Sequence, residues 1–175
     1  DPVRYLGNAS SGRQGYALAE VAAQRGARVT LVVGVTENLP TPCGAEVVRV
    51  KTARQMQAAV MEHARTADVV VMAAAVADYR PAEVAESKMK KGSDADLTTV
   101  HLTENPDILA GVVEARSRGD VASTTKIVGF AAETGDAEST PLDFARKKLE
   151  KKGCDLLMCN CLLYTSPSPR DRTRS

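Results

Sequence analysis

The chain has 175 residues, 43% of them hydrophobic, with two Phe, four Tyr, no Trp and a formal net charge of +1. This length predicts one domain with a substantial core. The near-neutral charge and scarce aromatic residues argue against nucleic-acid binding, and without a membrane-length apolar run or signal peptide we expect a cytoplasmic protein that does not bind membranes.

The first feature of the chain is a glycine-rich turn, Gly7–Gly15, which leads into a helix predicted over Tyr16–Arg25. Backbone N–H groups at such a turn can bind an anion. The spacing nevertheless matches neither the P-loop, which needs Lys-Ser/Thr where Arg13 and Gln14 stand, nor the G-x-G-x-x-G fingerprint. Ser10 or Ser11 is expected to cap the helix, Leu18, Val21 and Ala22 to form its apolar face, and Gly26 to end it.

Two short strands and a second helix are predicted next. The strands span Val29–Val33 and Glu46–Val50. The helix begins at a capping box formed by Thr52 and Gln55. Its apolar stripe consists of Met56, Ala59, Val60, His63 and Ala64, and we interpret His63 as a packed residue.

An unbroken apolar run, Val69–Val76, organises the rest of the chain. Such a run predicts a strand buried on both faces of a parallel sheet. Pro81 cannot continue a sheet ladder, so the chain is expected to leave the sheet there. Asp78 then lies at the carboxyl end of the strand, where α/β sheets bind ligands. Lys88, Lys90 and Lys91 follow in a loop that suits phosphate, although a solvated charged loop explains the same residues.

Strands and helices alternate through the remaining residues. A weak strand is predicted over Leu97–Leu102, followed by a helix capped by Asn105 with Pro106 in its first position. Its core face carries Ile108, Leu109, Val112 and Val113. A second buried strand over Lys126–Ala132, a helix that begins at Thr140 and ends at Gly153, and a last strand over Asp155–Cys159 complete the series. This order predicts an α/β, three-layer Rossmann-like fold, with a mostly parallel sheet and helices on both faces.

The C-terminal stretch breaks this pattern. Residues 161–175 are rich in Ser, Pro and Arg without periodicity, which predicts a disordered tail. Their sequence also matches a translated transposon-end sequencing adapter. We therefore expect residues 161–175 to be non-native. The four cysteines, Cys43, Cys154, Cys159 and Cys161, contain no C-x-x-C pair and are expected to be reduced and mostly buried.

Five motifs occur in one order, namely Asp1–Gly12, Ala73–Arg80, Lys88–Lys91, Asn105–Ile108 and Val128–Thr134. Together they closely resemble phosphopantothenoylcysteine synthetase over residues 1–160. In most bacteria this enzyme is the C-terminal half of a bifunctional coenzyme A biosynthesis protein whose N-terminal half is an FMN-dependent decarboxylase. The resemblance implies a homodimeric ligase that uses CTP and Mg²⁺ to activate 4′-phosphopantothenate as an acyl-cytidylate, from which cysteine displaces CMP.

The resemblance also implies roles for individual residues, with the metal ligands unknown. Asn8 and Lys88 would be catalytic, and Asn8, Ala74 and Ala75 would bind the substrate. The nucleotide would be bound by Asp78, Lys88, Asn105, Pro106, Asp107, Ile108, Phe130, Lys148 and Lys152. Lysines suit this chemistry because attack of a carboxylate on a phosphate brings anions together. Lys148 and Lys152 are four residues apart and share one helix face. Without the resemblance, this pair would indicate only a solvated helix end.

Two departures from the family pattern bear on activity. The family domain opens with a further strand before the Asp1–Gly12 motif, and it continues beyond Asn160 into residues that cover the substrate and support dimerisation. We therefore expect residues 1–160 to be a fragment that lacks its first strand and its C-terminal part. The alternatives are a Rossmann-type NAD(P)-dependent reductase, which the missing G-x-G-x-x-G and Tyr-x-x-x-Lys disfavour, and a non-catalytic nucleotide-binding module.

Overall fold

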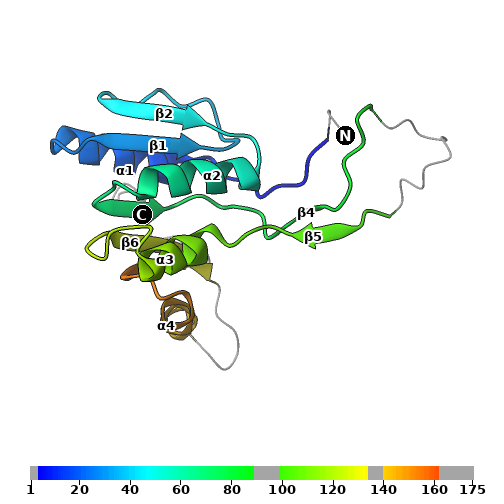
Figure 1. Ribbon diagram of the computed structural model, residues 1–175. Helices are drawn as coiled ribbons and strands as arrows, with labels where there is room; N and C mark the ends of the chain where they lie inside the picture. Colours follow the sequence, from blue (N-terminus) through cyan, green and yellow to red (C-terminus); the bar gives the residue numbers. More distant parts are fainter. Residues whose placement is uncertain (1–3, 89–98, 134–139, 162–175) are drawn as a thin grey trace, which may run out of the picture.

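The structure is a computed structural model, and it describes residues 4–88, 99–133 and 140–161. The helices of these residues are α1 (Arg13–Gln24), α2 (Ala53–Ala64), α3 (Ile108–Arg118) and α4 (Pro141–Lys152). The strands are β1 (Val29–Val33), β2 (Ala45–Arg49), β3 (Val69–Met72), β4 (Tyr79–Pro81), β5 (Leu102–Glu104), β6 (Lys126–Glu133) and β7 (Leu156–Cys161) (Figure 1). None of these helices has the length and apolar composition needed to cross a bilayer.

Local capping explains where α2 and α4 begin. The Thr52 hydroxyl accepts a hydrogen bond from the Gln55 amide at 3.2 Å, and the Gln55 side chain accepts one from the Thr52 amide. Thr140 and Asp143 form the same reciprocal pair before α4, and Gly153 (φ 67°) ends that helix. The predicted starts of both helices and the predicted end of α4 are confirmed, because the capping residues are close in sequence and need no tertiary partner.

Helix α1 differs from its prediction at both its start and its buried face. Its N-cap is Gly12, with φ 77° and no side-chain cap hydrogen bond, in place of a serine. Leu18 and Val21, expected in the core, are 41% and 47% exposed, whereas Tyr16 and Ala19 are buried. The predicted apolar face is wrong because the helix packs on β1 with the neighbouring face.

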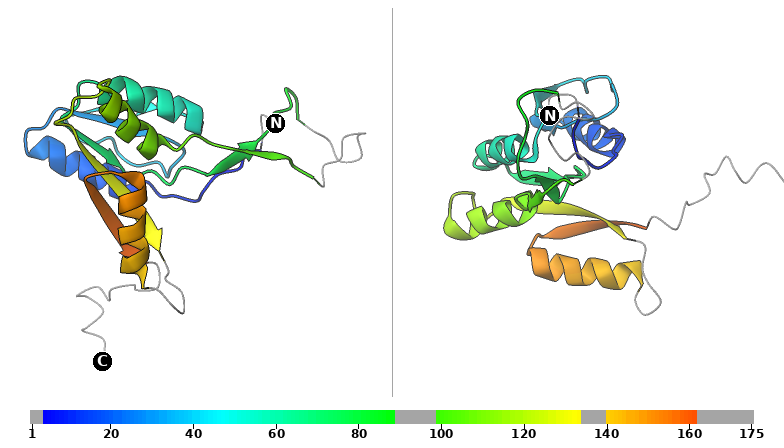
Figure 2. Two further views of the ribbon diagram at one scale, coloured as in Figure 1. Left: turned by 60° about the horizontal axis from the view of Figure 1, so that its bottom comes forward. Right: turned by 90° about the vertical axis from the view of Figure 1, so that its right-hand side faces the viewer.

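The sheets are mostly parallel, which confirms the predicted α/β fold class. Strand β1 pairs with β2 in parallel, and β6 pairs in parallel with both β3 and β7. Helices α2 and α3 lie on one side of these strands and α1 on the other (Figure 2). The layers are therefore helix, sheet and helix, as the alternation of strands and helices predicted.

The described strands leave one position of a doubly wound sheet open. Such sheets have the strand order 3-2-1-4-5-6. In that order β1-β2 would correspond to positions 2 and 3 and β3-β6-β7 to positions 4, 5 and 6, so that position 1, between β1 and β3, has no counterpart among the described strands. Helix α1 begins beside this position, because a Cβ added to Gly15 would lie 4.0 Å from the Ala73 Cβ, and Ala73 directly follows β3.

Strand β3 is shorter and less buried than the predicted Val69–Val76 strand. It ends at Met72, and Val69 and Val71 are 54% and 43% exposed. The pairing register places both on the sheet face that also carries Val128, Phe130, Leu156 and Met158. Because Leu156 and Met158 are also exposed, the prediction of burial on both faces is wrong: the described residues cover mainly the opposite face.

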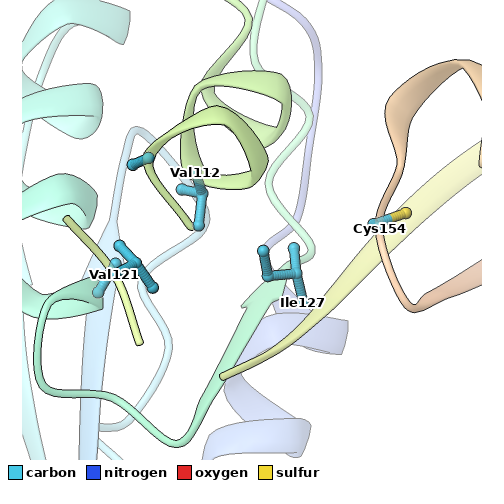
Figure 3. Close-up of a cluster of buried hydrophobic side chains, with 6 residues drawn as sticks. Val112, Val121, Ile127 and Cys154 are labelled. Atoms are coloured by element: carbon cyan, nitrogen blue, oxygen red, sulfur yellow. The ribbon is translucent and has the colours of Figure 1, made fainter. Parts of the chain in front are cut away.

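The hydrophobic core lies on that opposite face, between α2, α3, β6 and the start of β7. Val112 of α3 and Ile127 of β6 are fully buried, and Val121 is 1% exposed (Figure 3). The predicted core face of α3 is confirmed, because Ile108 is also buried and Leu109 and Val113 pack against the cluster. Cys154 joins this cluster, but Cys43 is exposed and Cys159 is half-buried. Among these three cysteines, the expectation of mostly buried thiols therefore holds only for Cys154.

Strands β4 and β5 form an antiparallel ribbon that extends away from the main body (Figure 1). The sequence did not predict β4, since Pro81 was expected to end all pairing. Pro81 is nevertheless paired with Leu102 at the end of the ribbon, and the next amide, Ala82, donates to the His101 carbonyl at 2.8 Å. The predicted strand over Leu97–Leu102 is shifted to Leu102–Glu104, and residues 97 and 98 lie outside the described residues.

Candidate functional site

Two asparagines hold three consecutive backbone carbonyls in the segment that joins β3 to β4. The Asn8 side chain donates to the Val76 carbonyl at 3.3 Å. The Asn105 side chain donates to the Ala77 carbonyl at 2.8 Å, and the Asn105 backbone amide donates to the Asp78 carbonyl at 2.7 Å. The structure therefore brings together Asn8, Asp78 and Asn105, which lie far apart in the sequence and were each predicted as site residues.

These contacts border a hollow of about 190 Å³. Its polar side chains are those of Asn8, Asp78 and Tyr79, and Asp78 is exposed. The structure records no ion pair between the Asp78 carboxylate and another described residue. The complete lining consists of Leu6, Gly7, Asn8, Ala77, Asp78, Tyr79 and Leu102. A carboxylate and an amide beside apolar walls can bind the hydroxyl, amine or amide groups of a small ligand.

The start of α3 lies next in the chain and differs from its prediction. Asp107, and not Asn105, is the N-cap, and its carboxylate accepts a hydrogen bond from the Ala110 amide at 3.1 Å. Pro106 precedes the cap, and Ile108 is the first helical residue and is buried. Asn105 cannot cap the helix because both ends of its side-chain amide are already bound, to Ala77 and to Arg80.

Lys152 in the last turn of α4 pairs with Asp107. Burial raises the pKa of the Asp107 carboxyl, but the hydrogen bonds from Lys152 and from the Ala110 amide and the charges of Lys152 and Lys151 outweigh it, so this pKa is lowered. Lys148, one turn earlier, is half-buried on the same helix face. The structure thus brings two predicted nucleotide-binding residues, Asp107 and Lys152, into direct contact with each other.

The other predicted site residues lie apart from the hollow. Ala74 and Ala75 are exposed in the segment that links β3 to Asp78. Phe130 is half-buried on the open face of β6. Lys88 is exposed beyond β4, and Lys90 and Lys91 lie outside the described residues.

The glycine-rich turn carries contacts that the sequence did not reveal. A Cβ added to Gly12 would lie 2.7 Å from the Thr36 Cγ2, so the start of α1 approaches the end of β1 closely. Arg13 pairs with Glu37 at 3.0 Å. Beside this pair lies a second hollow of about 380 Å³, lined by Arg13, Tyr16, Ala17, Glu20, Leu39, Pro40, Thr41, Pro42 and Cys43. None of the predicted site residues lines it.

Among the described residues, no group of three or more His, Cys, Asp or Glu side chains could hold a metal ion. Magnesium in nucleotide sites is commonly held by one or two carboxylates together with substrate phosphates. Asp78 supplies one exposed carboxylate at the hollow. These residues fit a magnesium ion that arrives with a nucleotide better than a magnesium ion bound by protein groups alone.

Comparison with known proteins places this chain in a family. Residues 1–167 match the family described as DNA/pantothenate metabolism flavoprotein C-terminal domain. The coenzyme A biosynthesis bifunctional protein CoaBC of Mycobacterium tuberculosis is 59% identical over 162 residues, which are 93% of this chain and 38% of that protein. The chain therefore spans less than half the length of this relative.

Solved structures give the same assignment. A crystal structure of the C-terminal domain of CoaBC is 38% identical with a TM-score of 0.73, and the match covers 91% of this chain and 69% of that one. A Cab2 mutant in complex with phosphopantothenate-cysteine shares the fold, with a TM-score of 0.71 at 19% identity over 97% of this chain and 72% of that one. The resemblance drawn from the five motifs is confirmed, and the chain belongs to the family of DNA/pantothenate metabolism flavoprotein C-terminal domains.

Proposed function

We propose that this domain ligates 4′-phosphopantothenate to cysteine in coenzyme A biosynthesis, with CTP as the activating nucleotide. The observation that carries the proposal is the pair of asparagines, Asn8 and Asn105, that hold the Val76–Asp78 carbonyls, beside a hollow that Asn8 and Asp78 line. The names of the relatives support it, since CoaBC is a coenzyme A biosynthesis protein and Cab2 was crystallised with phosphopantothenate-cysteine.

The proposed reaction has two steps. The carboxylate of 4′-phosphopantothenate attacks the α-phosphate of CTP, which forms an acyl-cytidylate and expels pyrophosphate. The cysteine amine then attacks the acyl carbon, which forms the amide and releases CMP. Both steps bring negatively charged groups close together, and their repulsion opposes the reaction. Cations that are held in place before the reaction reduce this repulsion.

Residues of this chain take distinct roles in the proposal. Asn8 keeps its side-chain oxygen available for the acyl intermediate, since its amide nitrogen binds Val76. Lys88 stabilises the charge that develops during acyl-cytidylate formation. Asp78 binds the nucleotide at the hollow, and a magnesium ion bound to the triphosphate offsets phosphate charge. Residues 105–108, Phe130, Lys148 and Lys152 complete the nucleotide site, while Ala74 and Ala75 contact the substrate.

We further propose that residues 1–160 form part of a larger synthetase domain and that residues 161–175 are non-native. The strand order of doubly wound sheets, which has a strand between the counterparts of β1 and β3, supports a further parallel strand in the complete sheet. An unpaired edge promotes aggregation. Residues 1–175 alone are therefore expected to be poorly soluble or partly unfolded and inactive.

A domain chimera, in which residues 1–160 replace the matching stretch in the C-terminal half of M. tuberculosis CoaBC, is expected to fold and to be active. Cooperative unfolding and turnover of the isolated chain would contradict this domain assignment.

A homodimer is the proposed assembly, and the β4–β5 ribbon is its proposed contact. Apolar side chains on and beside the ribbon are widely exposed, namely Tyr5, Leu6, Tyr79, Val84, Val100 and Leu102, and such patches mark protein interfaces. Changing Val84 and Val100 together to Glu should convert a dimeric chimera to a monomer in light scattering. Leu142→Glu, which alters an exposed leucine on α4, is the control that should remain dimeric.

Nucleotide choice tests the proposed activity. In calorimetry, the chimera should bind CTP more tightly than ATP or NADPH, and Asp78→Asn should weaken CTP binding. Asp120→Asn is a matched control, because Asp120 is an exposed aspartate that pairs with Arg118 just beyond α3. Equal affinity for all three nucleotides would contradict CTP as the co-substrate, and tighter binding of NADPH would favour the reductase alternative. We also propose that the domain acts in the cytoplasm.

A further inference from the structure

Arg80 binds the segment that joins β5 to α3, although none of the motif-based roles includes it. It lies in the middle of β4, opposite Thr103 of β5. Its guanidinium Nη1 donates to the Glu104 carbonyl and also to the Asn105 side-chain oxygen, the latter at 3.3 Å. The guanidinium is half-buried and does not line the hollow.

The Arg80 contact and the Ala77 carbonyl together determine which way the Asn105 amide points. Arginine has only donors, so it must bind the oxygen end of the amide. The nitrogen end then faces the Ala77 carbonyl, to which it donates at 2.8 Å. Without Arg80, this orientation would lose one of the two contacts that favour it, and the Asn105 side chain would be held only by the Ala77 carbonyl. The Asn105 backbone amide adds the bond to the Asp78 carbonyl.

We propose that Arg80 is a positioning residue that acts through Asn105 to fix the Ala77–Asp78 backbone, and with it the Asp78 side chain, opposite Asn8. In this assignment Asn105 serves the site by holding Asp78, because both ends of its side-chain amide are occupied by protein groups. The activity readouts below rest on the proposed function, whereas the hydrogen-exchange readout does not.

Hydrogen exchange tests the positioning without any ligand. In the chimera, Arg80→Met should accelerate exchange of the Asn105 backbone amide at least 10-fold, because its acceptor, the Asp78 carbonyl, is no longer held in place. Exchange at Val112 and Ile127, in the core, should not change. Arg49→Met is the matched control, since Arg49 is an exposed arginine at the end of strand β2 and should leave Asn105 exchange unchanged. Unchanged exchange at Asn105 in Arg80→Met would overturn the proposal.

Kinetics separate a positioning role from direct ligand binding. Arg80→Met should raise the KM for CTP and lower kcat/KM for CTP by on the order of 10²-fold, the loss expected from a misplacement of about 1 Å, while the KM for cysteine is unchanged. Arg80→Lys should recover only part of this loss, because a lysine presents a point charge in place of a planar fork. A variant that loses stability but keeps the parental KM for CTP would show a merely structural role.

A double-mutant cycle completes the test. If Arg80 acts through Asn105, the double variant Arg80→Met/Asn105→Ala should be no worse than Asn105→Ala alone. Losses that multiply would show that Arg80 contacts the ligand directly and would overturn the proposal. If the parental chimera neither binds CTP nor forms product, the proposed function fails, and the exchange experiment alone decides the role of Arg80.

Discussion

Lys152 and Asp107 join the last turn of α4 to the first turn of α3. The Asp107 carboxylate accepts the lysine's hydrogen bond with Oδ2 and caps α3 with Oδ1, so one side chain serves two elements. Both residues are partly exposed, at 23% and 45% of their side-chain surface. The ion pair itself therefore contributes little to stability, and the cap contributes more.

This division of roles predicts different effects for two substitutions of Asp107. Asp107→Ala in the domain chimera removes the cap and should lower the free energy of unfolding by about 1 kcal/mol. Asp107→Asn keeps a capping oxygen and should cost a few tenths of that amount. Urea unfolding of both variants checks the prediction. If the two variants lose equal stability, the ion pair, and not the cap, is the main contribution.

Asp155 makes the stability of the fold depend on pH in the acid range. The hydrogen bond from the Ile127 amide, at 2.8 Å, and the contact with Arg116 hold the pKa of the Asp155 carboxyl below its ordinary value of 3.8. A lowered pKa stabilises the folded state fully above the unfolded value, and this contribution is lost as the pH falls through the folded value. The free energy of unfolding should therefore fall below about pH 4 in the chimera.

Asp155→Asn should make this acid dependence shallower, because the position no longer titrates. Asp155→Ala should cost about 1.5–3 kcal/mol at neutral pH, since it leaves the buried Ile127 amide without its acceptor and removes the carboxylate partner of Arg116, which keeps the Thr125 and Gly153 carbonyls. Urea midpoints between pH 3 and pH 7 measure both effects. An unchanged slope in Asp155→Asn would mean that other carboxylates carry the acid sensitivity.

Gly12 is required by both its conformation and its contact with Thr36. Its φ is 77°, and an added Cβ would lie 2.7 Å from the Thr36 Cγ2. Gly12→Ala should therefore destabilise the chimera by on the order of 1–3 kcal/mol. Gly26→Ala is the matched control, because its φ is 87° with nothing within 4 Å of the added Cβ. Thermal unfolding should show the larger loss for Gly12→Ala, and equal losses would rule out a role for the Thr36 contact.

Lys88 is expected to matter for chemistry and not for folding. Lys88→Gln should lower the rate of acyl-cytidylate formation in the chimera by on the order of 10²–10³-fold, the loss typical of one preorganised charge donor. Rapid-quench detection of the intermediate measures this rate. Lys51→Gln, at an exposed lysine before α2, should react at the parental rate. Formation of the intermediate at the parental rate in Lys88→Gln would identify Lys88 as a solvated loop charge.

Sequence reasoning succeeded where the determining contacts are local or periodic. The capping boxes at Thr52 and Thr140 and the apolar face of α3 depend on residues within one or two turns. The resemblance also named Asn8 at the substrate and Asp78 and Asn105 at the nucleotide, and the structure brings these three residues together.

Prediction from the sequence failed where contacts between residues far apart in the chain determine the structure. Asn105 looked like a helix cap, but its amide is bound to Ala77, 28 residues away, and to Arg80, 25 residues away. No local pattern marks Arg80 as the residue that orients it. Strand β4 is three residues long and contains a proline, so it was not predicted. The exposure of Val69 and Val71 depends on whether other chain segments cover that sheet face, which an apolar run cannot indicate.

Product formation in the chimera tests the central claim most directly. The chimera is incubated with 4′-phosphopantothenate, cysteine, CTP and Mg²⁺, and products are identified by mass spectrometry. We predict 4′-phosphopantothenoylcysteine, CMP and pyrophosphate in equal amounts, with on the order of 10²-fold or greater loss in Lys88→Gln. Absence of the ligated product from a folded chimera, while unmodified M. tuberculosis CoaBC forms it under the same conditions, would contradict the assignment of this domain as a CTP-dependent ligase.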